Sequence, residues 1–218
     1  MSQKTYLELI NDVLLRLREN EVASVDQSNY VKLIGKYIND AKRVVEDSYN
    51  WNVLSATYTI STTNGVYNYA LTGAGTRFRV TDAYNNTNST GLFNETTTKM
   101  NELFLTSNVK SGAPDRYNFN GVDSNGDNLT DIYPIPDGVY NLRFNIIKPQ
   151  AELTDATTKM LVPAEPVIFH ALAKAIIERG EDAGLPSGEA YQLFQQSLAD
   201  HIATESGRYA DEFVWGSV

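Results

Sequence analysis

Two histidines are the first candidates for chemistry in this sequence. His170 and His201 lie in separate predicted helices. Glu178 follows the first histidine by two helical turns, and Glu205 follows the second by one turn. A zinc site needs at least three ligands, together with outer hydrogen bonds that orient them. The sequence contains no His-Glu-x-x-His arrangement, so we interpret both histidines as helix-face residues and predict no metal site.

A short acidic loop resembles the start of a calcium-binding loop. An EF-hand spaces its oxygen ligands at alternate positions of a twelve-residue loop. Similar spacing occurs at Asp123, Asn125, Asp127 and Asp131. However, Asn128 stands where an EF-hand has glycine, and Pro134 stands where it has a bidentate glutamate. We therefore favour a plain turn between two strands, with weak calcium binding as the alternative.

Paired carboxylates could serve as the acid and base of glycoside hydrolysis. The candidates are Glu46, Asp47, Glu178, Glu181 and Asp182. None lies in a recognisable motif, and in a chain with 27 acidic residues two will lie close by chance. Phosphate-binding glycine loops and serine nucleophile elbows are absent from the sequence, as is cysteine. We predict a protein that is not an enzyme, that needs no cofactor, and that works by binding other proteins.

Composition limits the partners that this chain can have. Its 218 residues carry a formal charge of −9, and Lys and Arg are scattered singly among more numerous acids. Proteins that hold nucleic acid carry a basic stripe, so the charge fits DNA that passes nearby without specific binding. No window approaches the roughly 18 apolar residues of a membrane span, and no signal peptide is evident. We expect synthesis in the cytoplasm and no membrane partner.

Apolar periodicity predicts helices at both ends of the chain. Residues 5–18 form the first, in which Thr5 and Glu8 have capping-box spacing, and residues 30–50 form a second with one continuous apolar stripe. A third helix begins near residue 162 and ends at Gly180. The apolar stripe of the last predicted helix consists of Tyr191, Phe194, Leu198 and Ile202.

Between these helices the apolar period changes to two, which predicts strands. We expect strands near residues 57–61, 66–71, 78–84, 117–122, 129–135 and 140–147, and a short helix within 97–107. Asn64-Gly65 between the first two strands predicts a β-hairpin. The predicted fold class is α+β, with a discontinuous helical bundle from residues 1–54 and 150–218 and an inserted antiparallel β domain at 55–149.

The last eleven residues carry aromatic side chains beyond the last predicted helix. A chain end is normally frayed and polar. Here Arg208 is followed by Tyr209, Phe213, Val214 and Trp215. These residues either fold back on the helices or anchor in a groove of a partner, since aromatic residues dominate interface hot spots. We favour the second interpretation.

The order of elements and several short phrases resemble a known family. The phrases are Tyr49-Asn-Trp51, Tyr133-Pro-Ile-Pro-Asp137, Leu153-Thr154, Leu161-Val-Pro163 and Phe169-His-Ala-Leu-Ala-Lys-Ala-Ile-Ile-Glu-Arg-Gly180. With two helices before the sheet and an alanine-rich helix after it, the chain is similar to the head-to-tail adaptors of short-tailed bacteriophages, also called tail tubular protein A or tail accessory factors. The resemblance spans nearly the whole chain.

This resemblance implies a structural role in a virion. Family members form a ring, usually of twelve copies, that joins the portal protein to the tail nozzle and continues the channel for DNA ejection. By position, Arg208, Tyr209, Phe213, Val214 and Trp215 would bind the portal. The alternatives are a virion-associated peptidoglycan hydrolase and a receptor- or carbohydrate-binding tail module, which the Asn/Thr/Tyr-rich sheet suggests.

Overall fold

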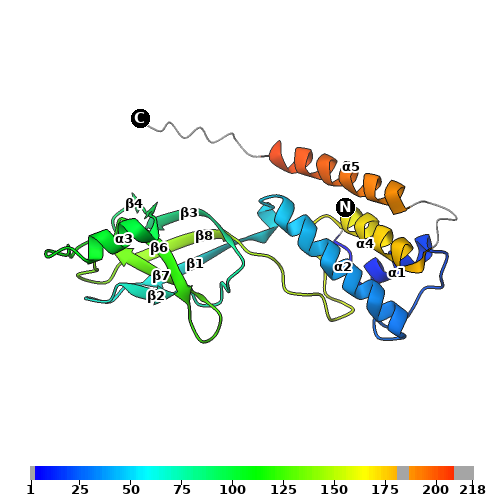
Figure 1. Ribbon diagram of the computed structural model, residues 1–218, viewed down its shortest axis with the longest axis horizontal. Coiled ribbons are helices and arrows are strands. Elements are labelled where there is room, and N and C mark those ends of the chain that lie inside the picture. Colours follow the sequence, from blue (N-terminus) through cyan, green and yellow to red (C-terminus); the bar gives the residue numbers. More distant parts are fainter. Residues whose placement is uncertain (1–2, 181–186, 209–218) are drawn as a thin grey trace. The chain divides into compact units, whose positions relative to one another are not determined.

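The computed structural model describes residues 3–180 and 187–208. Within these ranges the protein is a mixed α+β structure, as predicted. The chain divides into two compact units, one formed by Met1–Val53 with Gln150–Val218 and the other by Leu54–Pro149. Figure 1 shows the four longer helices gathered in the first unit and the strands in the second.

Two N-terminal helices begin at side-chain caps. Helix α1 spans Tyr6–Arg16, and Thr5 and Glu8 form the predicted capping box. The Thr5 N–H donates to Glu8 Oε2 at 2.7 Å, and the Glu8 N–H donates to Thr5 Oγ1 at 3.3 Å. Helix α2 spans Asn29–Ser48, and the Ser28 hydroxyl caps its first turn. These caps satisfy N–H groups that have no partner inside the helix.

The core of the helical unit draws on both ends of the chain. Helix α4 spans Ala164–Arg179 and ends at Gly180, whose φ of 64° is a left-handed conformation that suits glycine. Helices α1 and α2 both pack against α4. The fully buried side chains that they share include Leu9, Ile10, Val13, Ile34, Ile38, Val45, Val167, Ala171 and Ala175.

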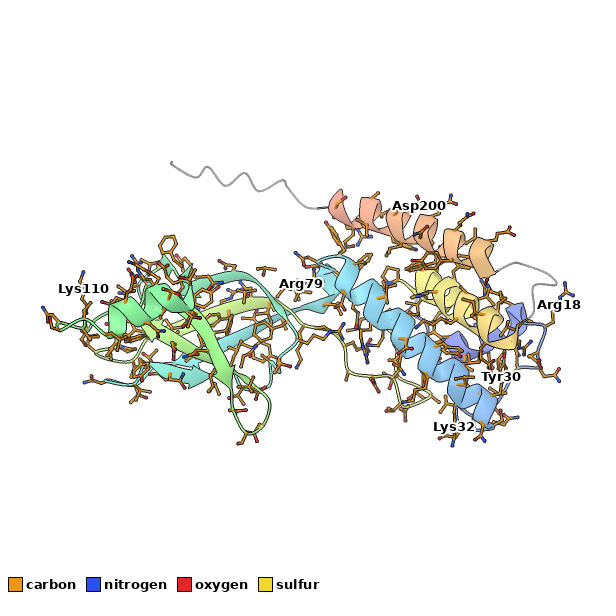
Figure 2. The ribbon with its side chains drawn as sticks, viewed as in Figure 1. Arg18, Tyr30, Lys32, Arg79, Lys110 and Asp200 are labelled. Atoms are coloured by element: carbon orange, nitrogen blue, oxygen red, sulfur yellow. The ribbon has the colours of Figure 1, made fainter. Side chains whose placement is uncertain are left out.

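The face that the last helix turns to the core overlaps only in part with the expected one. Helix α5 spans Ser187–Ser206 and packs on α4. Its buried residues are Ala190, Phe194 and Ser197, whereas Tyr191 is 45% exposed. The predicted stripe is therefore correct in part: Phe194 is buried as expected and Leu198 and Ile202 are half-buried, whereas the small side chains of Ala190 and Ser197 fill the rest of the contact. Asp200 lies on the exposed outer face (Figure 2).

An extended segment returns the chain to the helices after residue 149. Asn39 of α2 fixes it through two hydrogen bonds: its side-chain amide donates to the Leu153 carbonyl at 3.0 Å and accepts from the Leu153 N–H at 2.8 Å. Lys42 and Glu46 form a buried ion pair of 3.0 Å. Lys42 also donates to the Gln150 carbonyl, and Glu46 accepts from the Gln150 N–H. Four hydrogen bonds, made by Asn39, Lys42 and Glu46, thus tie this segment to α2.

The second unit contains two four-stranded sheets. One has the order β1-β8-β3-β4 and the other β2-β7-β6-β5. Their bounds are β1 Ser55–Ser61, β2 Asn68–Ala70, β3 Arg79–Asn85, β4 Thr90–Gly91, β5 Phe93–Asn94, β6 Arg116–Val122, β7 Asn128–Tyr133 and β8 Asn141–Ile147, with helix α3 at Thr97–Phe104. The pairing is antiparallel except between β5 and β6, which run parallel.

One core lies between the two sheets. It contains Ile60, Ala83, Leu142, Phe144 and Ile146 from the first sheet and Tyr117 and Ile132 from the second, together with Leu71, Ala74 and Leu92 from connections. Side chains of both sheets therefore meet face to face, as in a β-sandwich. The rings of Tyr117 and Phe144 cross this core edge to face, with centroids 5.2 Å apart.

The expected hairpin at Asn64-Gly65 is not formed. Gly65 has the positive φ of 79° that such a turn needs, but β1 pairs with β8 and β2 pairs with β7. The turn therefore connects two different sheets. The Asn-Gly pair determines the local bend, whereas the partner of each strand is decided by contacts with residues about 60 to 90 positions away.

Candidate functional site

The two histidines both lie at the contact between α4 and α5. His170 of α4 stacks on Phe194 of α5, with ring centroids 4.5 Å apart and planes at 19°. His201 of α5 faces Glu165 of α4, with Nε2 and Oε2 3.5 Å apart. Glu205 accepts instead from the Asn52 N–H and from Arg208. Among the described residues no group of three His, Asp or Glu side chains could hold a metal ion.

The environment of His170 favours its neutral form. Its Nδ1 atom is buried and has no hydrogen-bond partner. Burial lowers the pKa of His170, and the nearby Lys174 ammonium lowers it further, while Asp40 acts in the opposite direction. A neutral ring stacked on Phe194 is what an aromatic helix contact requires, because a charged ring would lose its hydration there.

The acidic loop uses its oxygens within its own fold. Asp123 Oδ1 accepts from the N–H groups of Asn125 at 2.8 Å and of Asp127 at 2.9 Å. These hydrogen bonds hold the pKa of the Asp123 carboxyl below its usual range. Asp127 is buried and accepts from the N–H groups of Gly73 and Gly75, both at 2.8 Å.

Asp131 is engaged in the same way. It accepts from the side-chain amides of Asn68 at 2.6 Å and Asn120 at 2.9 Å. The loop joins β6 and β7, which pair as an antiparallel hairpin. The acids that resembled calcium ligands in the sequence thus receive hydrogen bonds from backbone and amide donors that fasten the turn to its neighbours.

The candidate catalytic carboxylates lie in different surroundings in the described residues. Glu46 is buried against Lys42, and Asp47 and Glu178 are exposed. Burial raises the pKa of Tyr37, and the nearby charge of Glu178 raises it further. Tyr37 precedes Glu46 by nine residues, or about 13 Å along α2. Hydrolases hold their two carboxyl groups about 5 to 9.5 Å apart. Glu181 and Asp182 lie outside the described residues.

One end of the β unit carries exposed apolar side chains. Leu105 is 85% exposed and Val139 71%, and Val66 and Tyr67 are also exposed. We call these four residues the tip surface. The ring of Phe104, the residue before Leu105, lies 4.8 Å from the ring of Tyr67.

The tip surface lies at the end of the sandwich opposite to the chain crossings. The Gly65 N–H donates to the Pro136 carbonyl at 2.8 Å, which joins the loops that carry Val66 and Val139. The loop with Val66 follows Ser61 of β1, and the loop with Val139 precedes Asn141 of β8. Ser61 and Asn141 are register partners. The crossings to the helical unit occur at the other end of the same strand pair, where Ser55 faces Ile147. Lys110 also lies at the end of the β unit that carries α3 (Figure 2).

A cleft of about 990 Å³ opens in the helical unit. It lies between the start of α4, the end of α5, α1 and the segment at residues 51–53. Its apolar lining consists of Trp51, Val53, Leu161, Val162, Pro163, Ala164 and Ile168, and its charged lining of Lys4, Arg16, Glu165, Glu205 and Arg208, with His201. Sequence patterns did not reveal this cleft, because its lining comes from five separate segments.

Of the residues expected to bind a portal, the structure describes only Arg208. Its side chain is exposed and pairs with Glu205 at 3.1 Å. Tyr209, Phe213, Val214 and Trp215 lie outside the described residues. No helix of the described ranges is long and apolar enough to span a membrane.

Comparison with known protein families identifies the chain. The model of one family, described as SU10 adaptor protein, matches residues 4–213. The chain belongs to the SU10 adaptor family. This family comprises head-to-tail adaptors of short-tailed phages, so the resemblance seen in the sequence is confirmed. No curated protein matches the chain.

Membership in the SU10 adaptor family assigns a structural role. The match covers both the helical segments and the β unit. The protein is therefore a phage adaptor, a component of the virion that contacts portal and tail proteins and other subunits. The adaptors of this family are structural phage proteins.

Proposed function

We propose that this adaptor forms a ring, of twelve copies as its family implies, that joins the portal to the tail nozzle and continues the DNA channel. The observation that carries the proposal is the family match over residues 4–213. The structure supports it with two units that could each serve a different neighbour in the virion: helices from both chain ends and an inserted sandwich.

The C-terminal segment is the proposed portal contact. Phe213, Val214 and Trp215 offer large apolar side chains, and Arg208 and Tyr209 offer hydrogen-bond donors. Such residues supply most of the binding energy when they fill a groove of a partner. The segment follows directly on α5, which ends at Ser206, so it begins on the helical unit.

The tip surface is the proposed contact with the nozzle. Exposed large apolar side chains at one end of a sandwich are unusual for a surface in water when they cluster. Val66, Tyr67, Leu105 and Val139 stand on loops rather than strands, where a rigid sandwich positions binding residues. The chain crosses to the helical unit at the opposite strand ends, so the tip loops are separate from these crossings.

The acidic balance suits a channel through which DNA moves. With 27 acidic and 18 basic residues, a ring of copies would present a mostly negative lining. DNA carries one negative charge per about 1.7 Å of its axis, so such a lining repels the backbone and lets it slide.

Electron microscopy of the adaptor mixed with its own portal tests the ring. We expect a stoichiometric ring under the portal in negative-stain images, with copies equal in number to those in the family's rings. A portal that binds isolated subunits, or none, contradicts the proposal. The Phe213→Ala/Trp215→Ala variant should lose portal binding but retain its thermal unfolding midpoint, which separates the contact from the fold.

A further inference from the structure

The cleft in the helical unit has a preformed apolar floor. Trp51 is 2% exposed, and Val162 and Ile168 are each 3% exposed. The indole N–H of Trp51 donates to the Val45 carbonyl at 2.7 Å, which fixes the ring against α2. A volume of about 990 Å³ lies at the upper end of the range for ligand sites, so it can accept several side chains.

The rim of this cleft carries three cationic side chains and two carboxylates. Two of the cations are already paired, Lys4 with Asp12 and Arg208 with Glu205. Lys4, Arg16 and Arg208 line it, against Glu165 and Glu205. Both carboxylates already face donors, His201 and Asn52 respectively. Arg16 donates to the backbone carbonyl of Asp12 at 3.0 Å and lies over the Phe169 ring. No carboxylate of the described ranges pairs with Arg16.

The chain itself supplies a segment that matches this lining. The described residues of the chain end at Arg208, and Arg208 lines the cleft. Residues 209–218 then carry Phe213, Val214 and Trp215 next to Asp211 and Glu212. The apolar side chains suit the floor, and the two acids suit Arg16, whereas Lys4 is already paired with Asp12. Five residues reach about 17 Å when extended, so Phe213 can return to the floor.

We propose that the cleft binds the C-terminal segment of its own chain, residues 209–218, with Phe213 and Trp215 as anchors. A tether of a few residues gives an effective concentration in the millimolar range. At micromolar protein, the segment of the same chain therefore outcompetes that of a second copy. If the segment also binds the portal, the cleft and the portal compete for it, and the free adaptor keeps its anchor covered.

The absence of cysteine permits a direct test by disulfide trapping in the full chain. Val53→Cys places a thiol on the cleft, and Ser217→Cys places one beyond the anchors without removing them. The matched control is Val44→Cys with Ser217→Cys, because Val44 is 42% exposed and Val53 43%, and Val44 does not line the cleft. Mild oxidation is followed on non-reducing gels and by titration of free thiols.

We expect the 53/217 pair to close within one chain at least about tenfold faster than the 44/217 pair. Adding Phe213→Ala and Trp215→Ala should remove this difference. Equal rates for the two pairs overturn the proposal, and so does a product that is mainly a disulfide-linked dimer. The test contains no portal, so it succeeds or fails independently of the proposed adaptor ring.

Discussion

Several acidic side chains in this adaptor accept hydrogen bonds from backbone N–H groups. Asp127 shows the principle, since its two oxygens accept from the N–H groups of Gly73 and Gly75. A buried N–H without a partner costs about 1 to 3 kcal/mol. The Asp127 carboxylate therefore holds the loop at residues 73–75 against the β6–β7 hairpin.

Asp127→Ala should destabilise the β unit by about 2 to 4 kcal/mol, because two N–H groups lose their acceptor. Chemical denaturation followed by tyrosine fluorescence measures this loss. Asp123→Ala is a useful comparison, because Asp123 is only half-buried at the turn and its loss should cost less. Calcium should leave the unfolding midpoint of the wild type unchanged; a rise of several degrees would show that the loop binds the ion.

His170 should make stability depend on pH. Burial depresses the pKa of His170 in the folded state, below about 6.5 in the unfolded chain. Its contribution is thus fully present above pH 6.5 and is lost as the pH falls, because the unfolded chain binds the proton first.

His170→Phe keeps a ring against Phe194 and removes this titration. Between pH 7.5 and 5.5 we expect the unfolding midpoint of the wild type to fall more than that of the variant, as measured by thermal melts in matched buffers. Parallel curves would show that the histidine does not titrate with folding. His201 is present in both proteins, so its effect cancels.

At the scale of elements, the contact between α1 and α2 depends on one glycine. A Cβ added at Gly35 would lie 2.2 Å from Tyr6 Oη and 3.2 Å from Tyr6 Cζ. Tyr6 is only 7% exposed, so its hydroxyl has little room to move. The glycine lowers helix propensity by about 1 kcal/mol but allows the two helices to approach.

Gly35→Ala should therefore destabilise the protein by about 1 to 3 kcal/mol, because the methyl group overpacks the contact. In a Tyr6→Phe background the hydroxyl is gone, and the same change should cost much less or become stabilising through helix propensity. A double-mutant cycle measured by denaturant unfolding gives the coupling between the two sites. Additive effects would contradict the close contact.

The elements also show what the sequence could predict. Local signals located the capping box at Thr5 and the helix end at Gly180, because both depend on residues a few positions apart. The pairing of β1 with β8 and the division into two sheets could not be predicted, since neither depends on the turn at Asn64-Gly65. The face of α5 was misjudged in part because Ala190 and Ser197 carry little hydrophobic signal.

The same distinction between nearby and distant residues decides which candidate sites the sequence could predict. The sequence indicated that the histidines and acids have structural roles, and the family resemblance identified the phage adaptor. The cleft and the tip surface escaped notice because each is assembled from segments far apart in the chain: residues 4, 16, 51–53, 161–168 and 201–208 for the cleft, and residues 66, 67, 105 and 139 for the tip.

At the scale of the whole molecule, we expect mutations to separate binding to the nozzle from binding to the portal. Leu105→Asp with Val139→Asp puts charge on side chains that are 85% and 71% exposed, so folding should hardly change. Nozzle binding should fall by at least about tenfold, because charges at the centre of an apolar interface are costly. Pull-down with nozzle and with portal measures both contacts.

The control for this variant changes exposed residues of the helical unit, Leu15→Asp and Ile177→Asp, which are 61% and 67% exposed. These changes should leave nozzle binding intact. A tip variant that binds the nozzle normally would contradict the role of the tip surface, and one that loses portal binding as well would indicate a general defect in assembly.

The insertion of the sandwich between two halves of a helical core has a consequence for synthesis on the ribosome. Helices α1 and α2 emerge first, but α4, which covers their apolar stripes, is separated from them by the residues 54–149 of the other unit. At about 5 to 20 residues per second, the nascent chain carries Leu9, Ile34 and Ile38 uncovered for roughly 5 to 25 seconds. During that interval the sandwich can close, and the earliest helices are the natural substrate for a host chaperone.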